Sequence, residues 1–154
     1  GMMFVGEGPG RDEDLQGRPF VGKAGELLDK MILAIGLQRS EVYIANVVKC
    51  RPPDNRTPLP DEAAACLPIL RRQIELIRPK VLVTLGATPL RELLGVSTGI
   101  TKVRGQWQTL DMLGGIPVMP TFHPAYVLRQ YTQDVRRAVW DDLKAARNWM
   151  DGER

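Results

Sequence analysis

The chain alternates between short continuous runs of apolar residues and longer segments in which apolar residues recur at helical spacing. A continuous apolar run that ends at a turn residue is typical of a buried parallel strand, whereas helical spacing predicts an amphipathic helix. The runs predict strands at residues 2–5, 42–48, 81–85, 106–110 and 116–120. The periodic segments predict helices at residues 23–35, 61–78, 88–94 and 135–150. This alternation predicts an α/β fold, a sandwich whose central, mostly parallel sheet has about four strands.

Local signals predict where several of these elements begin and end. Gly36 should stop the first helix, while Asp61 and Asp134 can cap the second and the last. Pro68 lies inside the second helix and should kink it or delay its start. Gly114-Gly115 predicts a turn between the last two strands.

Three unusual segments follow predicted strands, namely residues 6–20, 46–53 and 122–129. In an open parallel sheet, ligands bind outside the carboxyl ends of the strands. We therefore expect these segments to meet at one site. Residues 50–60, which hold four prolines, and residues 97–105 are expected to be irregular connections.

The first of these segments opens with Gly6-Glu7-Gly8-Pro9-Gly10, and three carboxylates follow it at Asp12, Glu13 and Asp14. Alternate glycines after a strand allow a tight turn whose backbone lies bare against a ligand. The spacing is neither G-x-G-x-x-G nor a phosphate loop that continues into GK[ST], and the carboxylates would repel a phosphate. The loop therefore fits a base or sugar pocket better than a phosphate cradle.

Five residues of the three segments carry candidate chemistry. His123, the one histidine, is either structural or a donor to charge on a leaving group. Asn46 is either a buried amide that satisfies backbone groups or a side chain that recognises a base edge. Phe20 is either a core aromatic or a stacking platform for a planar ring. Glu7 and Glu13 are either solvated acids or groups that orient water and stabilise a cationic sugar.

Composition narrows the class of protein. With 154 residues, 44% apolar and 25% charged, the chain is expected to form a single domain over residues 1–154. A net charge of +3 is compatible with a polyanionic partner without requiring one. No apolar run approaches the roughly 20 residues of a membrane helix. Two cysteines without a CxxC motif favour the reducing cytoplasm over a secreted disulfide scaffold.

Four stretches together resemble the family 4 uracil-DNA glycosylases, the iron–sulfur branch of the uracil-DNA glycosylase superfamily. They are GEGPGRDEDLQGRPFVGKAGELL (6–28), VYIANVVKCRPPDNRTP (42–58), RPKVLVTLGATPLRELLG (78–95) and HPAYVLR (123–129). Their order extends the resemblance nearly from end to end. It implies the three-layer fold of that superfamily and a DNA repair activity. The reaction would be hydrolysis of the N-glycosidic bond of deoxyuridine, which releases uracil and leaves an abasic site.

The resemblance also implies how DNA would be held. The uracil would be flipped out of the stack, with Phe20 stacked on it and Asn46 bonded to its polar edge so that cytosine is rejected. His123 would stabilise negative charge on the uracil O2 as the bond breaks. The residues that would press into the duplex at the vacated position are Tyr126, Val127, Leu128 and Arg129.

On the water and sugar side, the resemblance points to Glu7 and Gly8, with Glu13 lining the pocket and helping to exclude the thymine methyl group. The best-known branch of the superfamily carries GQDPY, whose Asp activates water, but Gly8 stands at that place here. Catalysis would then depend on stabilising an oxocarbenium-like sugar and a uracil anion. The sequence leaves open which carboxylate holds the water.

A [4Fe–4S] cluster bound by four cysteines is also implied by the family. Cys50 and Cys66 match the downstream pair of ligands, but no upstream pair is present. Either the sequence lacks an N-terminal segment that carries the other pair, which we favour, or this member has dispensed with the cluster. We therefore expect the cluster to be absent or incomplete in this chain. Otherwise the two cysteines are free thiols or a chance disulfide.

The leading hypothesis is a monomeric uracil-DNA glycosylase that acts on uracil-containing DNA, with no membrane association. One alternative is a nucleic-acid-binding module with weak or no turnover. Another is a relative that acts on a different damaged base. Relatives that form a covalent adduct carry GEQPG and an extra basic segment before the histidine, whereas Gly8 and residues 119–122 depart from that pattern here. A nucleotide-binding domain unrelated to DNA leaves the histidine motif unexplained.

Overall fold

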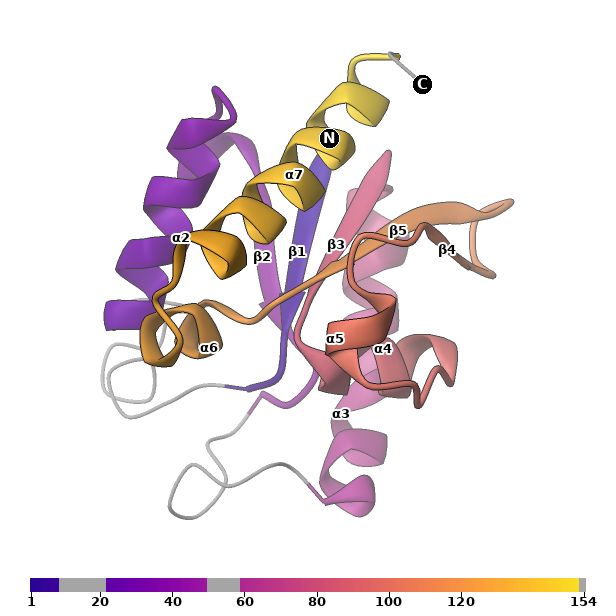
Figure 1. Ribbon diagram of the computed structural model, residues 1–154. Coiled ribbons are helices and arrows are strands. Elements are labelled where there is room, and N and C mark those ends of the chain that lie inside the picture. Colours follow the sequence, from indigo (N-terminus) through magenta and orange to yellow (C-terminus); the bar gives the residue numbers. More distant parts are fainter. Residues whose placement is uncertain (9–21, 50–58, 153–154) are drawn as a thin grey trace.

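The computed structural model describes residues 1–8, 22–49 and 59–152, which form a three-layer α/β sandwich (Figure 1). The central sheet has the strand order β2-β1-β3-β5-β4. Its strands are β1 (Met2–Gly6), β2 (Tyr43–Asn46), β3 (Val81–Leu85), β4 (Gln108–Leu110) and β5 (Ile116–Thr121). Neighbouring strands pair in parallel except for β4, which lies antiparallel to β5 at one edge. The predicted fold class is confirmed, and the sheet has five strands rather than about four.

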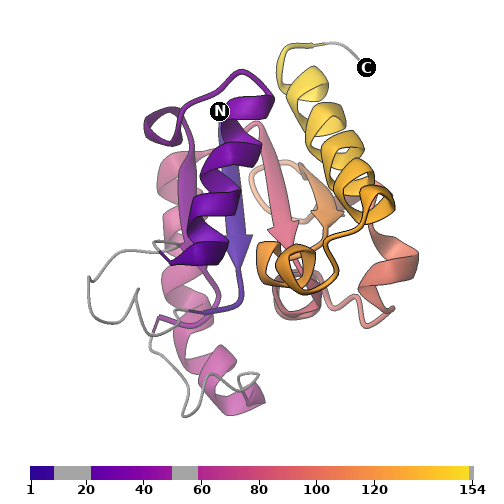
Figure 2. The same ribbon diagram turned by 60° about the vertical axis from the view of Figure 1, so that its left-hand side comes forward.

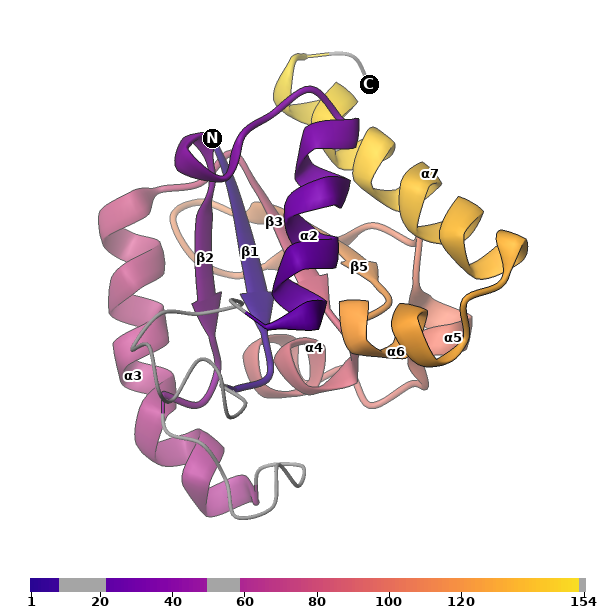
Figure 3. The same ribbon diagram turned by 90° about the vertical axis from the view of Figure 1, so that its left-hand side faces the viewer.

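Helices cover both faces of the sheet (Figures 2 and 3). One face carries α2 (Lys23–Ala34), α6 (Pro124–Arg129) and α7 (Gln133–Met150), and the other carries α3 (Pro60–Ile77) and α4 (Ala87–Leu94). Strand β1 shows why both layers are needed, because all five of its residues are buried. Met2 and Phe4 pack into the core beneath α2 and α7, whereas Met3 and Val5 pack into the core beneath α3 and α4. A strand with two apolar faces is stable only between two layers of helices.

The start of α3 differs from the prediction. The helix begins at Pro60, and the Leu59 amide donates to Glu62 Oε1 at 2.7 Å, so Asp61 lies in the first turn and is not the cap. A proline is well suited to the first helical position because its missing N–H would have no partner there. The helix also continues through Pro68, which therefore does not delay its start.

The cap of α7 and three short helices also differ from the prediction. Helix α7 is capped by Thr132, whose Oγ1 accepts from the Val135 amide at 3.2 Å, while Asp134 lies in the first turn. The short helices η1 (Arg39–Glu41), α5 (Ile100–Val103) and α6 were not predicted, and α5 lies in the segment expected to be irregular. Two predictions that depend on glycine are confirmed. Gly36 follows the end of α2 with a positive φ, and Gly114 and Gly115 form the turn between β4 and β5, also with positive φ.

The carboxyl ends of the four parallel strands lie at one edge of the sheet, beside α6 and the start of α4 (Figure 1). The N-terminus and the end of α7 lie toward the opposite edge. Within the described ranges, every helix is too short or too polar to span a bilayer.

Candidate functional site

The described parts of the three unusual segments lie at this carboxyl edge. Gly6, the last residue of β1, pairs in register with Asn46, the last residue of β2. Beyond the regular ladder, the amides of Val47 and Val48 donate to the carbonyls of Gly6 and Glu7, each at 2.9 Å. The backbone that follows β2 therefore remains alongside the start of the glycine-rich loop.

Asn46 is a buried amide whose hydrogen bonding is incomplete. Its exposed fraction is 6%, and its side-chain Oδ1 has no hydrogen-bond partner among the described residues. A buried acceptor without a donor costs about 1–3 kcal/mol, and this oxygen is available to a donor on a ligand. This arrangement differs from the structural alternative, in which the amide would satisfy backbone groups.

Glu7 is bonded to a residue that the sequence analysis did not identify. Thr88, at the start of α4, donates from Oγ1 to Glu7 Oε2 at 2.6 Å, and its exposed fraction is only 4%. The two residues are 81 positions apart, so no local pattern in the sequence connects them. The bond fixes one oxygen of the carboxylate at the edge of the site.

His123 follows β5 and is the N-cap of α6. Its Nδ1 accepts a hydrogen bond from the Ala125 amide at 3.0 Å, so the proton of the neutral ring lies on Nε2. The ring can therefore donate a hydrogen bond through Nε2. Gly86, which follows β3 with a φ of 87°, lies against this residue, and a Cβ at position 86 would be 3.3 Å from the Cβ of His123.

Asn46 and His123 stand on opposite sides of the site. Asn46 is the last residue of β2 and His123 follows β5, and β1 and β3 lie between these two strands, so about three strand spacings, roughly 14 Å, separate their backbones. The strands between them end at Gly6 and lead into Gly86, which have no side chains to fill the gap.

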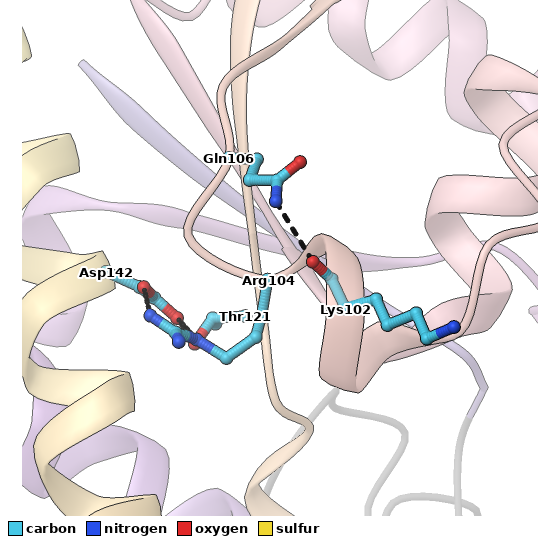
Figure 4. Close-up of polar contacts among 5 residues, drawn as sticks. All are labelled: Lys102, Arg104, Gln106, Thr121 and Asp142. Carbon is cyan, nitrogen blue, oxygen red and sulfur yellow. Dashed lines mark hydrogen bonds and ion pairs between the residues drawn. The ribbon is translucent and has the colours of Figure 1, made fainter.

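A buried ion pair supports the strand that leads to His123 (Figure 4). Asp142 of α7 accepts from Arg104 Nε at 2.9 Å, from Arg104 Nη2 at 2.5 Å and from Thr121 Oγ1 at 2.7 Å. Thr121 is the last residue of β5 and stands two positions before His123. The hydrogen bond to Asp142 raises the pKa of Arg104 above its usual range. Gly105 allows this close approach, because a Cβ there would be 2.9 Å from Asp142 Oδ1.

Helix α6 exposes some of the expected DNA-contacting residues and buries others. Leu128 is 42% exposed and Arg129 is also exposed, whereas Tyr126 is half-buried and stacks on Phe122 with ring centroids 4.7 Å apart. Val127 is fully buried in the core, so the expectation that it presses into a duplex is wrong.

Three predicted site residues, Glu13, Phe20 and Cys50, lie outside the described residues. Cys66 is a half-buried thiol whose Sγ accepts from the Lys49 amide at 3.5 Å. Burial lowers the pKa of Lys49, and the neighbouring Cys66 opposes part of this shift.

An iron–sulfur cluster needs a set of ligands that this chain does not provide by itself. In the described part of the chain, no group of three or more His, Cys, Asp or Glu side chains is placed to hold a metal ion. The whole sequence contains two cysteines, while a [4Fe–4S] cluster is held by four thiolates. The residues of this chain therefore do not fit the cluster on their own.

Comparison with known proteins relates the sequence that forms this site to one family. The model of the uracil DNA glycosylase superfamily matches residues 1–144. A protein of Thermotoga maritima, named type-4 uracil-DNA glycosylase, is 52% identical over 153 residues, which are 99% of this chain and 79% of that protein. A protein of Sulfurisphaera tokodaii with the same name is 48% identical over 154 residues, which cover 95% of this chain and 68% of the relative.

A more distant match is the type-5 uracil-DNA glycosylase of Pyrobaculum aerophilum. It is 30% identical over 139 residues, which cover 80% of this chain and 61% of that protein. Each of these relatives is named for the same reaction on uracil in DNA.

Proposed function

Because this chain belongs to the uracil-DNA glycosylase superfamily, we propose that the carboxyl edge of its sheet is where uracil is removed from DNA. The chain is a uracil-DNA glycosylase, a DNA repair hydrolase that cleaves the N-glycosidic bond of deoxyuridine and leaves an abasic site. We further propose which residue of the site carries out each part of this reaction.

The unpaired Oδ1 of Asn46 is the observation that carries the proposal. Uracil has a donor at N3–H beside an acceptor at O4, which matches the Oδ1 and Nδ2 atoms of a carboxamide. Cytosine has an acceptor at N3 beside a donor at N4, so it would leave Asn46 Oδ1 facing another acceptor. The same buried atom therefore supports binding of uracil and rejection of cytosine.

On the opposite side, His123 stabilises the leaving group. Negative charge develops on the uracil O2 as the glycosidic bond breaks, and a positioned donor lowers the energy of that state. The bond from the Ala125 amide to Nδ1 leaves the ring proton on Nε2, which supports this role for the neutral imidazole. His123 thus donates a hydrogen bond and does not need to lose a proton.

The sugar and water side is assigned to Glu7 and Gly8. The hydroxyl of Thr88 holds one oxygen of the Glu7 carboxylate, so the negative charge is fixed where an oxocarbenium-like sugar would form. Thr88 acts through Glu7 and is a positioning residue. Glu13 and Phe20 keep their expected roles, Glu13 in lining the pocket and Phe20 in stacking on the flipped base.

Binding to DNA is assigned to Leu128 and Arg129, which are exposed on α6, with Tyr126 supporting them from its stack on Phe122. Leu128 would occupy the position that the flipped base vacates, and Arg129 would contact a phosphate. We further propose that the protein acts as a monomer in the cytoplasm, where a free thiol such as that of Cys66 remains reduced.

The test is release of uracil from a labelled oligonucleotide that carries one deoxyuridine. The wild-type chain should release uracil, and both Asn46→Ala and His123→Ala should slow single-turnover release by about 10²-fold or more, because each removes a donor or acceptor used in the transition state. Asn148→Ala, a half-buried asparagine near the end of α7, is the matched control and should behave as wild type. A wild-type chain that releases no uracil overturns the activity, and an unaffected Asn46→Ala overturns the assignment of the base-binding residue.

A further inference from the structure

Behind Asn46, a lysine links the end of β2 to helix α3. Lys49 Nζ donates to the backbone carbonyl of Asn46 at 2.6 Å and to Gln73 Oε1, also at 2.6 Å. Gln73 in turn donates from Nε2 to the hydroxyl of Tyr43 at 3.3 Å. The ammonium thus connects the last residue of the strand to a side chain that α3 holds in place.

This link matters because, among the described residues, no hydrogen bond to Oδ1 orients the buried side chain of Asn46. The position of its backbone therefore contributes to where the carboxamide lies. Strand β2 is at the edge of the sheet, where one side of the strand has no neighbouring strand to pair with. The Lys49 ammonium provides a charged donor to the Asn46 carbonyl at this unsupported end.

Other contacts of Lys49 hold the same turn. Its amide donates to Cys66 Sγ at 3.5 Å, and the preceding amides of Val47 and Val48 donate across to β1. The turn that follows Asn46 is therefore attached on one side to the glycine-rich loop and on the other side to α3. Among the described residues, Lys49 attaches this turn to α3 twice, through its amide to Cys66 and through its ammonium to Gln73.

We propose that Lys49 is a positioning residue for base recognition, which holds the carboxamide of Asn46 at the orientation that binds uracil. The proposal rests on the function proposed above, in which Asn46 contacts the base. Two of the three N–H groups of the Lys49 ammonium donate to Asn46 O and Gln73 Oε1, which ties the ammonium to the end of β2 and to α3. In this proposal the effect of Lys49 on excision passes through Asn46.

The experiment is a double-mutant cycle on single-turnover uracil release. Lys49→Met keeps the length of the side chain and removes the donor, and we expect it to lower the rate constant about tenfold, less than the roughly 10²-fold cost of a 1 Å misplacement. KM should change by no more than about twofold, because the contact orients a group and does not bind DNA. In the Asn46→Ala background, Lys49→Met should have no further effect, because the group that it positions is gone.

Lys80→Met is the matched control. Lys80 is exposed and immediately precedes β3 at the opposite edge of the sheet, so its substitution should leave the rate unchanged. If Lys49→Met unfolds, Gln73→Met serves in its place, since it removes one acceptor of the ammonium. That variant should lower the rate about threefold, again only where Asn46 is intact.

The outcomes separate the two proposals. Rate losses that multiply in the double variant would overturn the positioning role, as would a Lys49→Met variant that equals the wild type. A loss confined to KM, with a weaker dependence of binding on salt, would also overturn it in favour of a phosphate contact. A wild-type chain without activity overturns the proposed function first and this inference with it.

Discussion

Replacing Asp142 with alanine should lower the free energy of unfolding by about 3–4 kcal/mol. Removing one partner of a buried ion pair typically costs about 3–5 kcal/mol, and the low end applies because Arg104 keeps 28% of its side chain exposed and can be hydrated. Thr121, which is completely buried, loses the acceptor for its hydroxyl at a cost of about 1–3 kcal/mol. These two penalties overlap, since both come from the loss of one carboxylate.

Urea unfolding followed by circular dichroism measures this difference. The neighbouring Asp141, exposed on the same helix, is the matched control, and Asp141→Ala should change stability by no more than about 0.5 kcal/mol. Thr121→Val should cost about 1 kcal/mol in the wild-type background, where it removes one of the two donors to Asp142 Oδ2 and leaves Arg104 Nε as the other. In the Asp142→Ala background it should cost nothing, because the hydroxyl that it removes already lacks a partner.

The reasoning would be refuted if Asp142→Ala cost less than about 1 kcal/mol, which would mean that water or a rearranged side chain replaces the three hydrogen bonds freely. Additive effects of Asp142→Ala and Thr121→Val would refute the more specific claim that the hydroxyl is stabilised by this carboxylate. Either result would also remove the argument that α7 supports the strand leading to His123.

Three other predictions concern the site and its cofactor. Thr88→Val should lower kcat for uracil release about fivefold or more, because it removes the hydrogen bond from the hydroxyl to Glu7. Thr88→Ser keeps the hydroxyl and should retain kcat, so equal losses in both variants would contradict this role. Arg129→Gln should reduce the slope of log affinity for DNA against log salt concentration by about one. Arg72→Gln on α3 is the control and should leave the slope unchanged. An unchanged slope in Arg129→Gln would exclude a phosphate contact. Iron and sulfide analysis of this chain should find no stoichiometric [4Fe–4S] cluster, since it contains two cysteines, and four irons per chain would contradict that expectation.

The sequence predicted those elements whose burial follows a simple period. Strand β3 was predicted at its observed bounds because a strand covered on both faces must be continuously apolar. Helix α6 was missed because its six residues are too few to show a helical period, although Pro124 at its first position is a start signal. The cap of α3 was placed wrongly because an apolar residue, Leu59, precedes the helix and the polar Asp61 lies inside it. The cap of α7 was placed wrongly because two polar residues, Thr132 and Asp134, are both suitable, and only the backbone geometry selects between them.

The candidate site was predictable as far as chain order determines it. Parallel strands bring Asn46 and His123 to one edge, which follows from topology alone. The partners that orient the site were not predictable, because each is a contact between distant segments, such as that of Thr88 with Glu7 or of Asp142 with Thr121. Such contacts depend on where helices pack on the sheet, and hydrophobic periodicity does not specify this at the level of single atoms.

The glycine after β3 also bears on how this fold can change its substrate. Any other residue at position 86 would have to adopt an unfavourable positive φ, and its Cβ would press against His123. We therefore expect this position to tolerate almost no substitution. Changes in base preference are then expected at other residues of the site, such as Asn46, which we assign to the edge of the base. A fold built in this way can retain one way of holding a flipped nucleotide while its members diverge in which nucleotide they accept.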